Sequence, residues 1–156
     1  MKGRAAVKTS RISAVAAAVA VGVAGLLSAG PAEAAGSVHL TKIYYDSPGK
    51  DTRSNKSLNA EYVQIKNSTS RSVNLRGWTL ADASRHRYVL PSVTLKPGHT
   101  VTVHTGQGRN TAANLYQQRR AYVWNNDRDK ATLKRASGAV QDTCAYNSAD
   151  RDWTAC

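Results

Sequence analysis

The sequence predicts an all-β fold, a β-sandwich of about eight or nine short strands, from three observations. Apolar and polar side chains alternate through residues 61–82, which is the pattern of half-buried strands. Turn-forming residues separate such stretches at intervals of roughly 8–12 residues, a spacing typical of sandwich proteins. Beyond residue 34, no segment keeps the apolar period of an amphipathic helix.

The first half of the predicted sandwich contains five strands. Residues 38–45 form the first strand, and the proline, glycine and polar residues of 47–59 predict an exposed loop after it. The second strand is 60–66, with Val63 and Ile65 on one face. A polar turn then leads to three shorter strands, 73–75, 78–80 and 87–90, the first two separated by Gly77.

The second half contains four predicted strands. Pro97 and Gly98 suit the central positions of a type II turn, because proline fixes a negative φ and glycine accepts a positive one. This turn leads into a strand at 100–105, and the glycines of 106–114 predict a flexible loop after it. The last three predicted strands are 122–124, 131–134 and 140–146, with a hairpin turn at Ser137-Gly138 between the final two.

Residues 1–34 have the three parts of a secretory signal peptide. A start with four Lys and Arg residues precedes an apolar run at 12–27, and Ala-Glu-Ala at 32–34 fits the small-x-small cleavage rule. A membrane anchor is the alternative, but the run is shorter than the roughly 20 strongly apolar residues that a span needs. We therefore expect cleavage after Ala34, secretion, and a single mature domain of residues 35–156 with no transmembrane segment.

Most of the positive charge belongs to that mature domain. The full chain has 22 Lys and Arg residues against 10 Asp and Glu. The leader contains four of the basic residues and Glu33, which leaves 18 against nine, a net charge of +9. Such a surface attracts polyanions, for example anionic cell-envelope polymers, DNA and phospholipid surfaces. The alternative is a cationic exterior that serves solubility and has no single partner.

Cys144 and Cys156 are the only cysteines, and both lie near the C-terminus. In an exported chain, an isolated even pair predicts a disulfide. A loop this short would contribute about 3 kcal/mol in the chain-entropy model and would close residues 144–156 into a tail attached to the last strand. Two free thiols or a metal-binding pair are the alternatives, although the chain has no CxxC and no histidine close to the pair in sequence.

An ordered set of motifs resembles the lamin tail domain family, which was first described in nuclear lamins and is also common in secreted bacterial proteins. The motifs are EYVQIKN at 61–67, VNLRGWTLAD at 73–82, YVLP at 88–91, LKPG at 95–98, VTVH at 101–104, VWNND at 123–127, ATL at 131–133 and VQD at 140–142. Single pieces such as LKPG are weak, whereas the ordered set is specific. The resemblance covers residues 37–146.

The resemblance implies an immunoglobulin-like β-sandwich with a binding or structural role and no catalysis. It carries no ligand site that could be transferred residue by residue. The basic charge and the cysteine-closed tail depart from the family pattern.

The sequence supports no metal or cofactor site. The histidines, His39, His86, His99 and His104, show no ligand spacing such as HExxH. Residues 125–129, NNDRD, could supply oxygen ligands to Ca²⁺, but no glutamate follows at the position an EF-hand loop requires. Asn and Asp also bond their own backbone in tight turns, and we interpret the segment as such a turn.

A small hydrolase is the least favoured class. No serine lies in a GxSxG motif, and Glu61 is the only glutamate after residue 34. Its position in the alternation matches that of Val63, so we expect a partly buried carboxylate. Because a lone buried charge is costly, it should pair with an arginine or with backbone N–H groups.

Six basic residues are the candidate polyanion-binding set: Arg85, Arg87, Arg119, Arg120, Lys134 and Arg135. Base-stacking proteins also need exposed aromatic side chains beside such cations. Trp78 and Trp124 have apolar neighbours on the same face, which predicts core positions, whereas Trp153 is the better candidate for an exposed ring.

The leading hypothesis is a secreted, monomeric, non-catalytic binding or structural module that acts at the cell surface. The alternative is a cationic extracellular protein that binds nucleic acid or other polyanions without sequence specificity. In either case, we expect specificity to come from the loops 46–59 and 106–120, from the basic clusters or from the tail.

Overall fold

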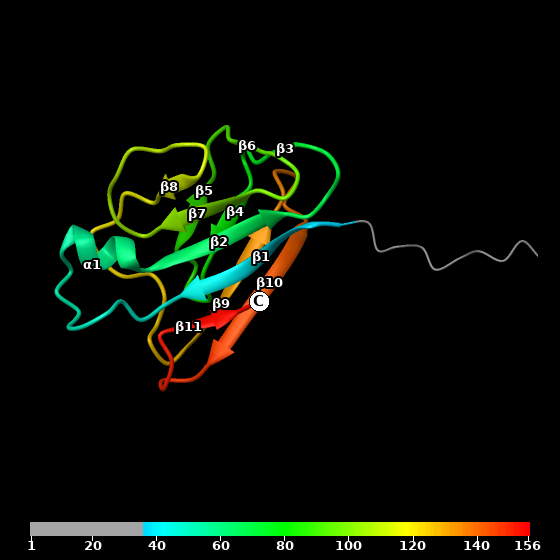
Figure 1. Ribbon diagram of the computed structural model, residues 1–156. Coiled ribbons are helices and arrows are strands. Elements are labelled where there is room, and N and C mark those ends of the chain that lie inside the picture. The colour runs from blue at the N-terminus through cyan, green and yellow to red at the C-terminus, as the bar shows by residue number, and fades with distance from the viewer. Residues whose placement is uncertain (1–35) are drawn as a thin grey trace, which may run out of the picture. The chain divides into compact units, whose positions relative to one another are not determined.

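The fold is described by a computed structural model over residues 36–156; the predicted signal peptide lies outside the described residues. Eleven strands and one helix appear in this part of the chain (Figure 1). The strands are β1 (Val38–Tyr44), β2 (Tyr62–Asn67), β3 (Val73–Asn74), β4 (Thr79–Ala81), β5 (Arg87–Val89), β6 (Thr94–Leu95), β7 (Thr100–His104), β8 (Asn114–Tyr116), β9 (Arg128–Lys134), β10 (Val140–Asn147) and β11 (Trp153–Ala155).

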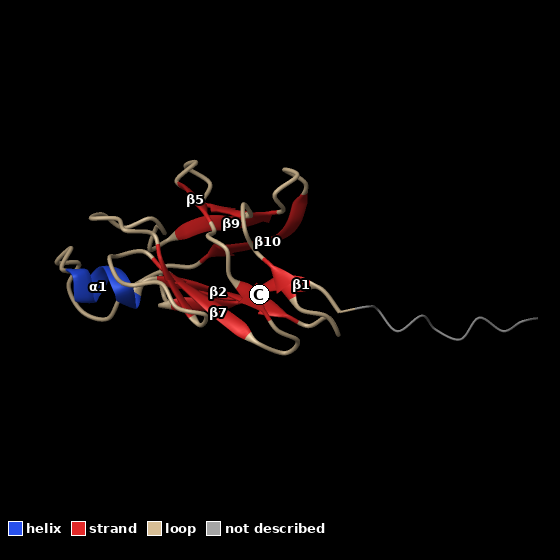
Figure 2. Ribbon diagram, turned by 90° about the horizontal axis from the view of Figure 1, so that it is seen from above, coloured by secondary structure: helices blue, strands red, loops and turns tan. Residues whose placement is uncertain are grey.

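Two principal sheets form the layers of a sandwich, which confirms the predicted all-β, immunoglobulin-like class. One sheet has the strand order β11-β1-β2-β7-β8, and the other has the order β10-β9-β4-β5. A third, two-stranded sheet consists of β3 and β6. Seen from above, β1, β2 and β7 lie in one layer and β5, β9 and β10 in the other (Figure 2).

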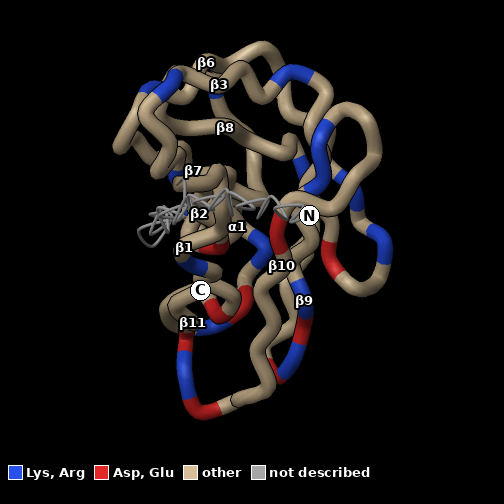
Figure 3. The backbone as a smooth tube through the Cα atoms, turned by 90° about the vertical axis from the view of Figure 1, so that its right-hand side faces the viewer, with Lys and Arg blue, Asp and Glu red and all other residues tan. Residues whose placement is uncertain are grey.

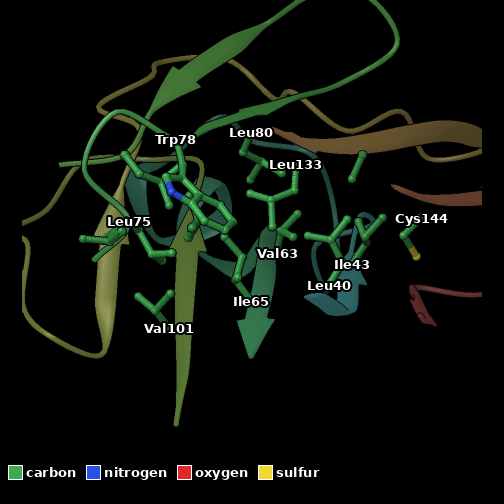
Figure 4. Packing of buried hydrophobic residues seen from close by; sticks show 14 of the residues in the cluster. Leu40, Ile43, Val63, Ile65, Leu75, Trp78, Leu80, Val101, Leu133 and Cys144 are labelled. Carbon is green, nitrogen blue, oxygen red and sulfur yellow. The ribbon is translucent and has the colours of Figure 1, made fainter. Parts of the chain in front are cut away.

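Alternation along the strands places the core between the two layers. Val63 and Ile65 of β2 have no exposed surface, while Leu80 of β4 and Leu133 of β9 face them from the other layer (Figure 4). Trp78 is 9% exposed and packs into the same cluster, and Trp124 is buried as well, so both predicted core positions are confirmed. Each fully buried leucine of this kind contributes roughly 1.5–3 kcal/mol relative to exposure.

The predicted loop at 47–59 contains a short helix, α1 (Asn55–Ala60). Ser54 caps it, because its side-chain oxygen accepts a hydrogen bond from the Ser57 N–H at 3.3 Å. Leu58 is the buried residue of this helix. A single turn with one apolar contact has no period to detect, which is why the helix is missed in the sequence.

The expected strand at 122–124 is wrong. Val123 and Trp124 are buried, as their apolar character suggested, but the segment is irregular. The Val123 N–H donates at 2.9 Å to the Glu61 carboxylate, so a buried side chain satisfies this backbone group in place of a neighbouring strand.

Three further strands were not predicted. Residues Thr94–Leu95 form β6, which pairs antiparallel with β3. Residues Asn114–Tyr116, at the end of the expected flexible loop, form β8, which pairs in parallel with β7. Residues Trp153–Ala155 form β11, which pairs antiparallel with β1. The Pro97-Gly98 turn is confirmed, since Gly98 has a φ of +75° and the His99 N–H donates to the Lys96 carbonyl at 3.1 Å.

The predicted disulfide between Cys144 and Cys156 is present, with a Cα–Cα distance of 5.6 Å. Cys144 lies in β10 of the four-stranded sheet, whereas Cys156 directly follows β11 of the five-stranded sheet. The bond therefore joins the two layers. The tail is covalently attached to the last long strand, as expected, but its backbone pairs with the first strand, β1.

Candidate anion-binding face

The outward-facing surface of the β10-β9-β4-β5 sheet is strongly basic. Along β9, Asp129, Ala131 and Leu133 are buried, so the residues between them point away from the core. Among those outward residues, Lys130 and Lys134 are exposed cations. The period of two therefore gives β9 one apolar face and one cationic face.

Strand register brings a second cation from a distant part of the sequence to the same face. Lys134 pairs with Thr79 of β4, and Ala81 of β4 pairs with Arg87 of β5. A hollow of about 320 Å³ lies over β4, with Thr79 and Ala81 among its lining residues. Because the side chains of Thr79 and Ala81 are short, they form the floor of the hollow, and the longer basic side chains around them project further from the sheet and form its rim.

Arg135 completes the rim of this hollow, together with Arg87 and Lys134. Its Nε donates a hydrogen bond to the side-chain oxygen of Gln141. The Gln141 amide nitrogen in turn donates to the Val38 carbonyl at 2.9 Å. These two hydrogen bonds, through Gln141, orient the guanidinium of Arg135.

The cations of the rim have no carboxylate partner among the described residues. Within residues 36–156, the ion pairs are His86 with Asp82 at 2.6 Å and Arg128 with Asp127 at 3.3 Å. Arg87, Lys134 and Arg135 take part in neither pair. Their charge is therefore free to attract an external anion. We define these three residues, with the floor residues Thr79 and Ala81, as the basic hollow.

The remaining predicted candidates lie outside the basic hollow. Arg119 comes closest, because its guanidinium donates to the Arg87 carbonyl at 3.3 Å and so lies beside β5. Arg85 is exposed in the turn between β4 and β5, with a φ of +71°. Arg120 is exposed in the segment after β8 and makes no contact that would bring it to the hollow. The structure thus brings three of the six together and places a fourth next to them.

Acidic residues are concentrated elsewhere. Several lie around β11 and the loop before it, as the red segments of Figure 3 show. Burial raises the pKa of Asp46 above its usual value, and the neighbouring charges of Asp51 and Asp152 raise it further. Asp129 of β9 and Asp82, directly after β4, are buried, so the outer face of β9, β4 and β5 carries no negative charge from these strands.

Residues 125–127 form a turn held by acidic side chains, as predicted, whereas Arg128 and Asp129 already belong to β9. Asp129 accepts hydrogen bonds from the Ala83 N–H at 2.9 Å and from the Asn125 N–H at 3.3 Å. Asp127 accepts from the Arg128 N–H at 2.8 Å, and this bond lowers the pKa of its carboxyl group. Among the described residues, no group of three or more His, Cys, Asp and Glu side chains is arranged to hold a metal ion.

Glu61 has a structural environment. Its side chain has no exposed surface, and its Oε1 accepts from the Thr105 hydroxyl at 2.6 Å and the Val123 N–H at 2.9 Å. The expected backbone N–H partner is confirmed, whereas no arginine forms an ion pair with it. Burial raises the pKa of Glu61 to about 7. A carboxyl group sealed inside the sandwich cannot reach a substrate.

Within residues 36–156, no helix combines the length and the apolar character needed to cross a bilayer.

Sequence comparison gives a match to the Lamin Tail Domain family over residues 31–148, which include ten of the eleven strands. No curated protein matches the sequence. The matched family is a β-sandwich module, in agreement with the two layers, and is generally non-catalytic. The protein therefore belongs to the lamin tail domain family.

Proposed function

We propose that this protein is a secreted, non-catalytic module that binds anionic polymers outside the cell through the basic hollow. The observation that carries the proposal is the convergence of Arg87, Lys134 and Arg135 on one hollow without carboxylate partners among the described residues. A polymer with regularly spaced phosphate groups would release its counterions into bulk solvent as its phosphates meet these cations.

Two further observations support an extracellular setting. The basic start, apolar run and small-x-small site of residues 1–34 are the pattern of an export signal. The disulfide between Cys144 and Cys156 persists in oxidising compartments and is rare in the cytosol. With the leader removed, the net charge of +9 would add long-range attraction to the contacts in the hollow.

The test is a titration of the mature protein with a labelled DNA duplex and with inorganic polyphosphate, each at several salt concentrations. The variant Lys134→Glu/Arg135→Glu removes two cations from the rim. The control Lys50→Glu/Lys56→Glu makes the same charge change at exposed positions in the segment before β2. We expect the rim variant to lose about tenfold or more in affinity and the slope of log affinity against log salt to decrease by about 2.

The control variant should lose much less affinity. Equal losses in both variants would show that net charge alone drives binding and would reject the basic hollow. An absence of binding at low salt for both polymers would reject the proposed function itself.

A further inference from the structure

A row of aromatic side chains crosses the outward face of the other sheet. The register pairs Tyr44 of β1 with Trp153 of β11 on one side and with Tyr62 of β2 on the other. Tyr62 pairs with His104 of β7, which pairs with Tyr116 of β8. These five residues come from five separate parts of the sequence, one from each strand of the sheet (Figure 1).

Neighbouring rings within the row are in contact. The ring centroids of Tyr44 and Tyr62 are 5.4 Å apart, and those of His104 and Tyr116 are 5.0 Å apart, both pairs being stacked. Tyr62 and His104 are 5.8 Å apart and tilted. Cross-strand stacking of this kind stabilises a sheet, which accounts for the inner part of the row.

Cross-strand stacking does not explain the position of Trp153. Within residues 36–156 its ring stacks on no other aromatic side chain, and the residue is 44% exposed. The Nζ atom of Lys42 lies 4.0 Å from its ring centroid and 5.7 Å from that of Tyr44. An indole held in this manner, partly open to solvent and with a cation over one part of it, has the form of a contact residue.

A parallel row of polar side chains accompanies the rings. Lys42 pairs with Gln64, Gln64 with Thr102, and Thr102 with Asn114, so the four lie next to one another across the sheet. One step further, Lys66 pairs with Thr100. None of the residues in these strands is acidic, and Asp152, directly before Trp153, borders the face at one end, where its carboxylate accepts a hydrogen bond from the Tyr44 hydroxyl at 3.5 Å. The face therefore offers rings, amides, hydroxyls and positive charge together.

We infer that this aromatic face, formed by the five aromatic residues with Lys42, Gln64 and Lys66, binds an acidic polysaccharide. The C–H faces of sugar rings are apolar and pack on aromatic side chains, while their hydroxyls need donors and acceptors such as Gln64. Carboxylate or sulfate groups along the chain match the charge of Lys42 and Lys66. The inference concerns a different surface from the basic hollow and shares with it only the negative charge of the ligand.

A single-stranded nucleic acid fits this face less well. Stacked bases need free ring faces, but three consecutive ring pairs already contact one another at 5.0–5.8 Å. The outer end of the row is also closed, because Gly108 packs so tightly on Tyr116 that an added Cβ would lie 2.6 Å from its ring. A sugar needs one exposed ring, which Trp153 offers at the other end of the row, whereas a strand of bases needs several free rings in succession.

The test is affinity electrophoresis of the mature protein in gels that contain polygalacturonate, with neutral dextran gels and a single-stranded oligo-dT titration as comparisons. Trp153→Ala and Lys42→Gln each alter the aromatic face. Val89→Ala removes an exposed apolar side chain, and Lys56→Gln an exposed lysine, from other surfaces. We expect the first two variants to weaken polygalacturonate binding about tenfold each, and the two controls and Lys134→Glu/Arg135→Glu to bind as the unmodified protein does.

Near-ultraviolet circular dichroism and a thiol assay check that each variant remains folded and oxidised. Should Trp153→Ala disturb the tail, Lys42→Gln still decides the question, since it leaves the ring row in place. Binding of polygalacturonate that is insensitive to both substitutions would overturn the inference, as would no binding. Ring-dependent binding of oligo-dT without polygalacturonate binding would assign the face to nucleic acid instead. A loss of polygalacturonate binding in Lys134→Glu/Arg135→Glu, with binding retained in the Trp153→Ala and Lys42→Gln variants, would assign the polysaccharide to the basic hollow.

Discussion

The carboxyl group of Glu61 lies just before β2 and ties the irregular segment around Val123 to the end of β7. It does so through two hydrogen bonds, to the Thr105 hydroxyl and to the Val123 N–H. Because these groups are buried, the carboxyl is both a structural anchor and a titratable group inside the core. Its protonation should therefore be linked to folding.

We expect the free energy of unfolding to fall as the pH rises from about 4.5 to about 7. The pKa of Glu61 is raised from its usual 4.5 to about 7 by burial, so the folded state keeps a proton that the unfolded chain releases over this window. The effect amounts to at most about 3 kcal/mol. Urea unfolding of the unmodified protein and of Glu61→Gln, each at pH 5 and pH 8, measures it.

In Glu61→Gln this component of the pH dependence should disappear, because the amide does not titrate. An equal pH dependence in both proteins would mean that the carboxyl is ionised at no cost in the folded state.

Trp78 provides a test of the core at a single position. It is 9% exposed and packs among the buried residues of both layers, so Trp78→Ala should lower the free energy of unfolding by about 3–5 kcal/mol. The exposed Trp153 is the internal comparison, and its replacement by alanine should cost less than about 1 kcal/mol. Chemical denaturation gives both values, and a small loss at Trp78 would place its indole on the surface.

At the scale of elements, most strands were predictable, among them the short β3, β4 and β5, whereas β6, β8 and β11 were not. β2 and β7 were located to within two residues, because alternation over five or six residues is visible in the sequence. β8 and β11 have three residues each; β8 pairs in parallel with the preceding strand β7, and β11 pairs with β1, more than 100 residues earlier in the chain. The segment at 122–124 has apolar residues but bonds to a side chain, which no period reveals.

The candidate sites, too, were only partly predictable from local sequence patterns. Lys134 and Arg135 are adjacent in sequence, so their cluster was visible, but their neighbour Arg87 reaches them only through the order β9-β4-β5. The aromatic face depends still more on register, since a shift of one residue in any strand would turn its ring to the other side. Local patterns identify which side chains share a face of one strand, and sheet order determines what they meet.

The disulfide is the element-scale feature with the clearest energetic consequence. Replacing Cys144 and Cys156 by serine should lower the free energy of unfolding by about 3 kcal/mol and should loosen β11 first, because only three residue pairs hold that strand to β1. Hydrogen exchange should then show faster exchange at Trp153–Ala155 than in β2. Unchanged stability after reduction would mean that the tail is held by its backbone contacts alone.

At the scale of the whole molecule, the expected form is a cleaved and oxidised domain. We expect material secreted by the cell to begin at Ala35, as the site at 32–34 predicts. Its mass under non-reducing conditions should be lower by two hydrogens than after reduction, since one disulfide is present. Intact-mass spectrometry measures both, and secreted protein that retains Met1 would contradict the export signal.

The position of the tail also determines how the first strand meets other molecules. β1 has one edge that faces away from β2. Strand β11 covers this edge over Lys42–Tyr44. Closer to the start of β1, the Leu40 N–H donates a hydrogen bond to the Asp142 side chain at 2.7 Å. An uncovered sheet edge is a template on which another chain can add a strand. Oxidation of the last residue, Cys156, thus keeps this edge closed. We expect reduced protein to self-associate through β1 as its concentration rises, which size-exclusion chromatography with and without reductant would show.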